Sequence, residues 1–384
     1  MALSIGLAVA GVAVISQYLG AKEEEKAKEY IALLLILSIG IGVLFNGILY
    51  VIAPSVLDFM GAEGAVYEQA LIYMRTRSFE MPFLFIFTAF QATRQARGDT
   101  TTPVILSVVA VLINIILTAL FIRVYNMGIL GAGLSTVIGQ MVIVPVALYL
   151  MFSKRQRLHL SLKDLHIKPK NLSKLVGIAL PSAGSQAFSS LGFLILQAII
   201  LAYGERVAAA FSIGNKISNL LLIPVSALGS VLAAFVGQNI GARNKERAKK
   251  AYRVSRNVAV AISCIGGLII YPCREVLLGL LTNDGETVQI AMEYMFWVLL
   301  TQPLMSLFQN YMGAFNGSGN TKYSFYIATA RLWVIRLPLI MFMKNVTDLG
   351  RSGIWYAMVI SNFVIILYAM FLFRKVDFEP KIKA

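Results

Sequence analysis

Charged side chains are scarce in this chain of 384 residues. Asp, Glu, Lys and Arg together make up 14% of it, whereas soluble globular proteins average about 25%. Cysteine and histidine are almost absent, with Cys264 and Cys273 in an apolar stretch and His159 and His166 in a polar connector. These four residues give no disulfide framework, no metal-binding spacing and no histidine cluster. The composition therefore argues against a soluble enzyme and predicts no metal site.

Long hydrophobic runs dominate the sequence instead. Hydrophobic residues make up 58% of the chain, and the mean hydropathy is +0.74. A membrane-spanning helix needs roughly 20 mostly apolar residues. We therefore expect an all-α, polytopic integral membrane protein with eleven spans, the first of them short. The predicted spans are 2–17, 31–54, 70–93, 103–122, 130–152, 175–203, 207–236, 254–273, 290–314, 323–343 and 353–373.

The basic residues are distributed unevenly between the two sides of these spans. Of 34 Lys and Arg residues, 24 fall on the side that includes the C-terminal tail, five on the other side and five within spans. Such an asymmetry marks the basic side as cytoplasmic. Membrane topology and anionic lipid then explain the basic excess without nucleic acid. We expect a multi-pass protein of the cell membrane, monomeric, in contact with lipids, with a cytoplasmic C-terminus.

The chain repeats itself at a fixed offset of 221 residues. The matched pairs include Gln17 and Gln238, Gly20 and Gly241, Tyr73 and Tyr294, Pro82 and Pro303, and Gly98 and Gly319. Corresponding connectors fall on the same side, which predicts two parallel repeats of six spans around an axis along the membrane normal. The counterpart of the start of the second half would precede Met1. We therefore expect the sequence to lack the first helix and part of the second.

This repeat also predicts the domain organisation. Residues 1–152 form an incomplete N-terminal lobe, and residues 153–174 form a basic cytoplasmic connector that contains a proline. Residues 175–374 form the C-terminal lobe, and residues 375–384 form a cytoplasmic tail. A proline in a polar, basic stretch between apolar runs is typical of such a boundary.

Three short motifs, two of them repeated, resemble those of the multidrug and toxic compound extrusion (MATE) transporters. They are Val14–Ala27 with its partner Val236–Ala248, Gln95–Pro103 with its partner Asn316–Thr321, and Gly131–Thr136. The resemblance covers nearly the whole chain. It implies a secondary active exporter of lipophilic organic cations or drugs, driven by antiport of H⁺ or Na⁺. It further implies that the protein is not an enzyme and needs no cofactor other than the coupling ion.

The resemblance also indicates candidate residues in the N-terminal lobe. One branch of the family uses an Asp on the first helix, an Asn and an Asp four residues apart on the fifth, and a Thr on the sixth. Asn114 and Thr136 match that Asn and Thr, but Thr118 stands at the position of the Asp. The acidic residues of the other branch are missing as well. We retain Asn114, Thr118, Thr136 and Gln140 as candidate substrate or ion contacts.

Ionisable groups inside spans are costly and usually face a cavity. Glu80 is the one clear acidic case, and a buried carboxyl could load and release a proton. A pair with Arg77, on the same helix face, is the structural alternative. Pro82, two residues later, and its repeat partner Pro303 remove an amide donor at equivalent places, which predicts matched helix bends. Such discontinuities often mark transporter sites.

Basic residues inside the second half support a rival function. Lys216, Arg331 and Arg336 would stabilise the lobe or contact substrate, and an excess of positive charge would suit a pyrophosphate head. A lipid-linked precursor flippase of the related superfamily is therefore the alternative. An integral-membrane enzyme finds no support, because no paired carboxylates and no phosphate loop occur in the sequence.

Overall fold

The computed structural model describes residues 1–154 and 158–381, and within them every regular element is a helix. Ten helical segments are long and apolar enough to cross a membrane. The first half contains α1 (Ala2–Gly20), α2 (Glu24–Phe59), α3 (Gly64–Ser78), α4 (Glu80–Ala96), α5 (Thr101–Ala119), the π-helical turn η1 (Leu120–Val124) and α6 (Gly128–Phe152). The second half contains η2 (Leu162–Asp164), α7 (Pro169–Leu201), α8 (Glu205–Gly241), α9 (Lys245–Gly279), α10 (Gly285–Gly317), α11 (Thr321–Thr329), the π-helical turn η3 (Ala330–Arg336), α12 (Leu337–Val346) and α13 (Ser352–Arg374).

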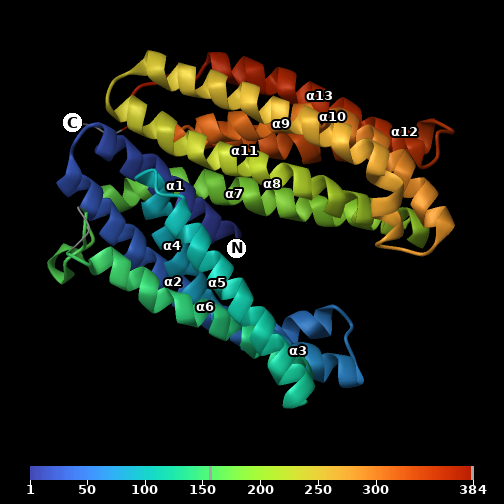
Figure 1. The fold of residues 1–384 in the computed structure, drawn as a ribbon, viewed down its shortest axis with the longest axis horizontal. Helices are drawn as coiled ribbons and strands as arrows, with labels where there is room; N and C mark the ends of the chain where they lie inside the picture. Colours follow the sequence, from blue (N-terminus) through green and yellow to red (C-terminus); the bar gives the residue numbers. More distant parts are fainter. Residues whose placement is uncertain (155–157, 382–384) are drawn as a thin grey trace.

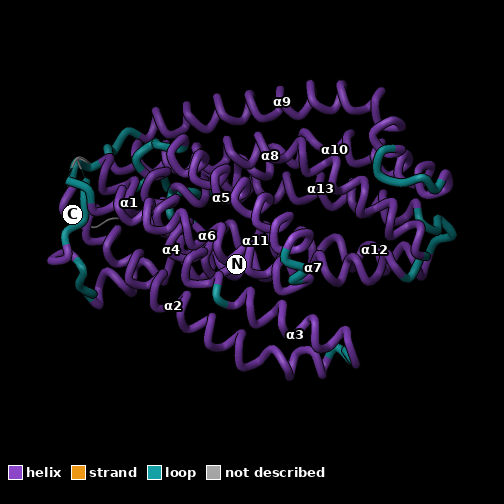
Figure 2. The backbone as a smooth tube through the Cα atoms, turned by 60° about the horizontal axis from the view of Figure 1, so that its bottom comes forward, coloured by secondary structure: helices purple, strands orange, loops and turns teal. Residues whose placement is uncertain are grey.

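The two halves form two helical lobes, as the repeat predicted. Figure 1 shows α2 to α6 on one side and α8 to α13 on the other, with the lobes meeting at the end that carries the C-terminus. They separate toward α3 and α12 at the opposite end. Figure 2, turned by 60°, also places α3 and α9 on opposite edges of the molecule. The helices of the two lobes therefore diverge with distance from the C-terminus.

Most predicted spans coincide with helices, which extend several residues further at their charged ends. One prediction was wrong: the expected span 70–93 is two helices, because α3 ends at Ser78 and α4 begins at Glu80. Pro82 explains the break, since proline lacks an amide donor and its ring clashes with the carbonyl four residues earlier, here that of Ser78. By contrast, α10 continues through the repeat partner Pro303. The matched prolines therefore have unequal effects.

The first long helix of the second half begins inside the expected connector. Helix α7 starts at Pro169, so the last residues of the expected connector 153–174 already form its first turns. Proline suits this position because its missing amide would be unpaired there anyway. The Asn171 amide and the Lys168 ammonium both bond Glu29 at the start of α2. The connector is therefore anchored to the first half.

Candidate functional site

A pocket of about 320 Å³ lies between the lobes, where they meet. It is lined by α1 and α4 from the first half and by α8 and α10 from the second. The lining consists of residue pairs related by the 221-residue offset, with Gly313 as the single addition: Ile5 and Ser226, Ala8 and Gly229, Val9 and Ser230, Val12 and Ala233, Thr88 and Gln309, Gln91 and Met312, and Gln95 and Asn316. The pocket therefore lies on the symmetry axis of the repeat, and its polar groups are uncharged amides and hydroxyls.

Two hydrogen bonds hold the lobes together near the ends of α4 and α10, and they occupy equivalent positions in the two halves. The Gln17 amide donates to the carbonyl of Gly317 at the end of α10 (3.4 Å), and the Gln238 amide donates to the carbonyl of Ala96 at the end of α4 (2.7 Å). Both the donors and the acceptors are 221 residues apart. Gln95 adds a bond across the lobes to the Ser230 carbonyl (2.6 Å). We call this set of contacts the basic-end gate, because the basic connectors surround it.

Two glycines allow the helices to approach this closely. A Cβ atom added to Gly20 would lie 1.9 Å from the carbonyl oxygen of Gln238, and one added to Gly241 would lie 1.9 Å from that of Gln17. The sequence predicted only that these glycines end helices, which they do. They also allow the two backbones to cross in close contact, because a residue with a Cβ atom would not fit there.

The turn that follows α4 is held by Asp99 at the edge of this gate. Its carboxylate accepts the backbone amide of Thr102 in the first turn of α5 (3.0 Å) and pairs with Arg94 (3.3 Å). Burial alone would raise the pKa of Asp99, but the hydrogen bonds from Thr102 and the charge of Arg94 outweigh it and hold the pKa below its usual range. Asp99 is therefore ionised at neutral pH and fixes the start of α5.

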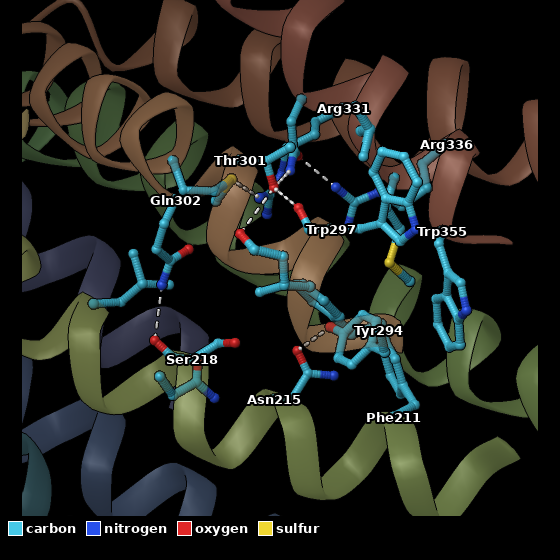
Figure 3. A pocket seen from close by; sticks show the side chains of 18 residues that line it. Phe211, Asn215, Ser218, Tyr294, Trp297, Thr301, Gln302, Arg331, Arg336 and Trp355 are labelled. Atoms are coloured by element: carbon cyan, nitrogen blue, oxygen red, sulfur yellow. Dashed lines mark hydrogen bonds between the residues drawn. The ribbon is translucent and has the colours of Figure 1, made fainter. Parts of the chain in front are cut away.

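A second pocket, of about 90 Å³, lies inside the second half (Figure 3). Its aromatic side chains come from α7, α8, α10 and α13: Phe193, Phe211, Tyr294, Trp297 and Trp355. Its polar groups are tied to one another, since Tyr294 donates to the Asn215 side chain (3.0 Å) and Gln302 to the Ser218 carbonyl (2.9 Å). We call it the C-terminal pocket.

Arg331 and Arg336 place two guanidinium groups in the wall of this pocket. Both lie on the π-helical turn η3, a local widening of a helix that occurs frequently at functional sites. They are 7% and 5% exposed, and neither forms an ion pair with a described residue. Lys216, the third basic candidate, is exposed on α8 and does not line the pocket. The structure thus brings together two of the three predicted groups.

The N-terminal candidates gather in one polar cluster between α5 and α6. The Asn114 amide donates to Thr136 (3.0 Å) and to Ser135 (3.4 Å), and Thr118 shares a hydrogen bond with Ser135 (2.6 Å). Gln140 lies one turn beyond Thr136, and the described part of the chain gives its buried side-chain oxygen no hydrogen-bond partner. Ser135 connects the cluster, although the sequence analysis did not single it out. Its position beside Thr136 was the available signal.

Glu80 is the single buried acidic residue among those described, with 3% of its surface exposed. Its carboxylate lies 3.0 Å from the guanidinium of Arg77, the ion pair that the structural alternative predicted. Arg77 itself is partly accessible. The pair lies where α3 gives way to α4, beside the break caused by Pro82. No group of three or more His, Cys, Asp or Glu that could hold a metal ion occurs in the described part of the chain.

The MatE family profile matches residues 1–120 and 181–342, which is most of the chain. The chain belongs to the MATE family. It is similar to a probable multidrug resistance protein, YoeA of Bacillus subtilis (strain 168), with 25% identity over 98% of this chain and 83% of that protein. A probable multidrug resistance protein NorM of Photorhabdus laumondii is 28% identical over 89% of this chain and 76% of its own length.

Solved structures of MATE proteins share the fold. One, described as the outward-facing conformation of a multidrug resistance MATE family transporter, superimposes with a TM-score of 0.93 at 23% identity, covering 97% of this chain and 84% of that one. The resemblance stated from the sequence motifs is therefore confirmed. The chain is a multi-pass MATE membrane transporter, a class of protein that needs no cofactor.

Proposed function

We propose that this MATE protein is a secondary active exporter of lipophilic organic compounds that works by alternating access of the inter-lobe pocket. The observation that carries the proposal is the basic-end gate. Its contacts repeat across the two halves, and they close one end of a pocket that lies on the symmetry axis. Two matched lobes that meet at one end and separate at the other can rock about the fixed pocket. Such a motion would open one end of the pocket while it closes the other.

The distribution of charge orients this cycle. We assign the basic end and the C-terminal tail to the cytoplasm of the cell in which the protein resides, following the positive-inside rule. The gate is then closed on the cytoplasmic side, and the lobes diverge toward the outside. This is the state from which an exporter releases its cargo. The proposed lobes are residues 1–152 and 175–374, and the exposed apolar side chains of their outer helices suit contact with lipid in a monomer.

We assign the driving reaction to proton antiport, with Na⁺ as the alternative. Glu80 supports a proton, because it is a buried carboxylate whose one ionic partner, Arg77, is partly open to solvent. The polar cluster around Asn114 offers hydroxyl and amide oxygens to Na⁺, but the described structure gives it no carboxylate. Organic cations and drugs remain the proposed cargo. The relatives carry multidrug resistance names, which favours export over the flippase alternative.

The test is transport by the purified chain in proteoliposomes. We expect accumulation of a fluorescent organic cation against its gradient when a pH gradient is imposed. An equal Na⁺ gradient should give no accumulation. Transport that follows the Na⁺ gradient alone would contradict proton coupling. Transport under neither gradient, together with gradient-independent translocation of a lipid pyrophosphate, would overturn the exporter in favour of a flippase.

A further inference from the structure

The C-terminal pocket contains two positive charges without a negative one. Arg331 and Arg336 are each more than nine-tenths buried. The pocket lining contains no Asp or Glu, and the described residues supply neither guanidinium with an ion pair. A buried charge inside a membrane protein is costly unless it is paired or faces a water-filled cavity. The lining of the pocket therefore contains no negative charge to balance its two guanidinium groups.

The two arginines differ in how well the protein satisfies them. Arg336 is held in place: its Nε donates to the Ser361 hydroxyl (2.9 Å) and a terminal nitrogen donates to the Asn362 side chain (2.6 Å). Arg331 donates to the sulfur of Met305 (3.3 Å), and a thioether is a weak acceptor. The Nε of Arg331 is buried and has no hydrogen-bond partner among the described residues. Arg331 thus keeps donor capacity for a group that enters the pocket.

Aromatic rings surround the Arg331 guanidinium. The ring centroids of Phe308 and Phe193 lie 4.6 Å and 5.8 Å from its central carbon. Such contacts partly compensate a buried cation, but they do not occupy its N–H donors, of which one bonds the weak acceptor Met305. A planar guanidinium with free donors binds an oxyanion through charge-assisted hydrogen bonds. The pocket wall beyond it, with Trp297 and Trp355, suits an aromatic or apolar body.

The C-terminal pocket lies on the same helix faces as the inter-lobe pocket. On α8, the positions Phe211, Asn215, Ser218 and Leu222 continue at helical spacing into Ser226, Gly229 and Ala233. On α10, Tyr294, Val298, Thr301 and Met305 continue in the same way into Gln309, Met312 and Asn316. Asn219, at the edge of the C-terminal pocket, is exposed. The two pockets therefore lie one after the other along the same face of α8 and of α10.

We infer that the C-terminal pocket is a binding site for the oxyanion head, a carboxylate or a phosphate, of an amphiphilic molecule. Arg331 binds the oxyanion, Arg336 fixes the pocket wall through Ser361 and Asn362, and the aromatic side chains take the apolar body. At about 90 Å³ the cavity accommodates a head group, while the body extends along α8 and α10 toward the inter-lobe pocket. This inference deepens the proposed export function, because it adds amphiphilic anions to the cargo.

The test measures binding at equilibrium and so does not depend on transport. The protein is placed in nanodiscs of phosphatidylcholine and titrated calorimetrically with 4-phenylbutyrate and with its neutral amide, with empty nanodiscs subtracted. We expect the acid to bind at least about tenfold more tightly than the amide, because only the acid supplies a charge-assisted partner. Equal affinities for the acid and the amide would overturn the inference.

Three variants identify the group responsible. Arg331→Gln should abolish the preference for the acid, and Arg331→Lys, which keeps the charge and loses the planar donors, should retain part of it. Lys344→Gln is the matched control, because Lys344 belongs to the same span but is exposed and outside the pocket. A preference for the acid that survives Arg331→Gln would place the anion elsewhere and contradict the assignment. The wild-type comparison of acid and amide remains decisive if a variant fails to fold.

A further experiment with anionic lipid distinguishes the two sources of such an oxyanion, which are lipid phosphate and free organic anions. Nanodiscs containing phosphatidylglycerol should weaken binding of 4-phenylbutyrate if lipid phosphate occupies the site, and should leave it unchanged if the site takes free organic anions. Either result supports the oxyanion site and identifies its source. Failure of the proposed exporter would instead show as absent gradient-driven transport with the acid preference intact. The two proposals can therefore fail separately.

Discussion

Gly20 and Gly241 occupy equivalent positions in the two halves, and each packs against the backbone of the residue three before the other. The gap is so small that a Cβ atom on either glycine would lie 1.9 Å from a carbonyl oxygen, that of Gln238 or of Gln17. The sequence shows these two segments only as similar. In the folded protein the two similar segments also pack against each other. The two halves close against each other with the same surface.

Substituting Gly20 by alanine should open the basic-end gate. The added methyl group cannot fit beside the Gln238 carbonyl, so the ends of α1 and α8 must move apart. We expect transport to fall at least about tenfold, equivalent to about 1.4 kcal/mol, at unchanged expression. Alkylation of a cysteine introduced at Ser230, in a background without Cys264 and Cys273, measures the opening from the basic side.

The matched control for this prediction is Gly40→Ala. Gly40 lies within α2, and an added Cβ would meet no described residue within 4 Å apart from the adjacent backbone of its own helix, so alanine should be neutral or slightly stabilising there. Gly241→Ala should reproduce the effect of Gly20→Ala, since its contact is the mirror of the first. Normal transport by both glycine variants would show that the gate does not have to close this tightly.

Replacing Glu80 by glutamine should lower pH-driven efflux. The amide keeps the size of the carboxyl but cannot carry a proton in exchange, and it loses the ion pair with Arg77. We expect the dependence of efflux on the imposed pH gradient to be lost, while substrate binding persists. Glu68→Gln, on the exposed surface of α3, should leave efflux unchanged. Efflux by Glu80→Gln at the wild-type rate would remove Glu80 from the mechanism.

Ser135→Ala should loosen the packing of α5 on α6. The serine hydroxyl is bonded to Thr118 at 2.6 Å and accepts from Asn114, so its removal leaves two polar side chains with fewer partners. We expect a loss of about 1 to 2 kcal/mol of stability, read as a lower apparent melting temperature in detergent. Ser135→Thr, which retains the hydroxyl, serves as the control. An unchanged melting temperature for Ser135→Ala would mean that the cluster contributes little to stability.

The lowered pKa of Asp99 predicts that the stability of the folded protein depends on pH. Its folded pKa lies below its usual range, so its stabilising effect is fully present above the unfolded pKa and is lost as the pH falls through the folded pKa. Asp99→Asn removes the charge that pairs with Arg94 and should therefore cost up to about 1 kcal/mol at pH 7, and the difference from wild type should vanish in acid. Melting temperatures of both proteins between pH 3 and pH 7 measure this. A difference that stays constant across this range would contradict an ionic role.

The hydrophobic runs determined the number, order and approximate limits of most membrane helices, because spanning length and apolar composition are local properties of the sequence. Identical residues at a fixed offset determined the 221-residue repeat and, through it, two similar lobes. The break at Phe79 could have been anticipated from Pro82, whose ring acts four residues upstream. It was missed because the polar stretch from Arg75 to Glu80 was placed in one span with the apolar residues on either side of it, and hydropathy does not register a missing backbone hydrogen bond.

The tertiary structure decided which candidates meet. Sequence matching placed Asn114, Thr118 and Thr136 in one list, and packing of α5 on α6 made them one cluster through Ser135. Arg331 and Arg336 were recognisable as costly intramembrane charges, but their pocket is assembled from α7, α8, α10, η3 and α13, which are far apart along the chain. A cavity is the space that such remote helices fail to fill. Its walls depend on their crossing and are not encoded in any one segment.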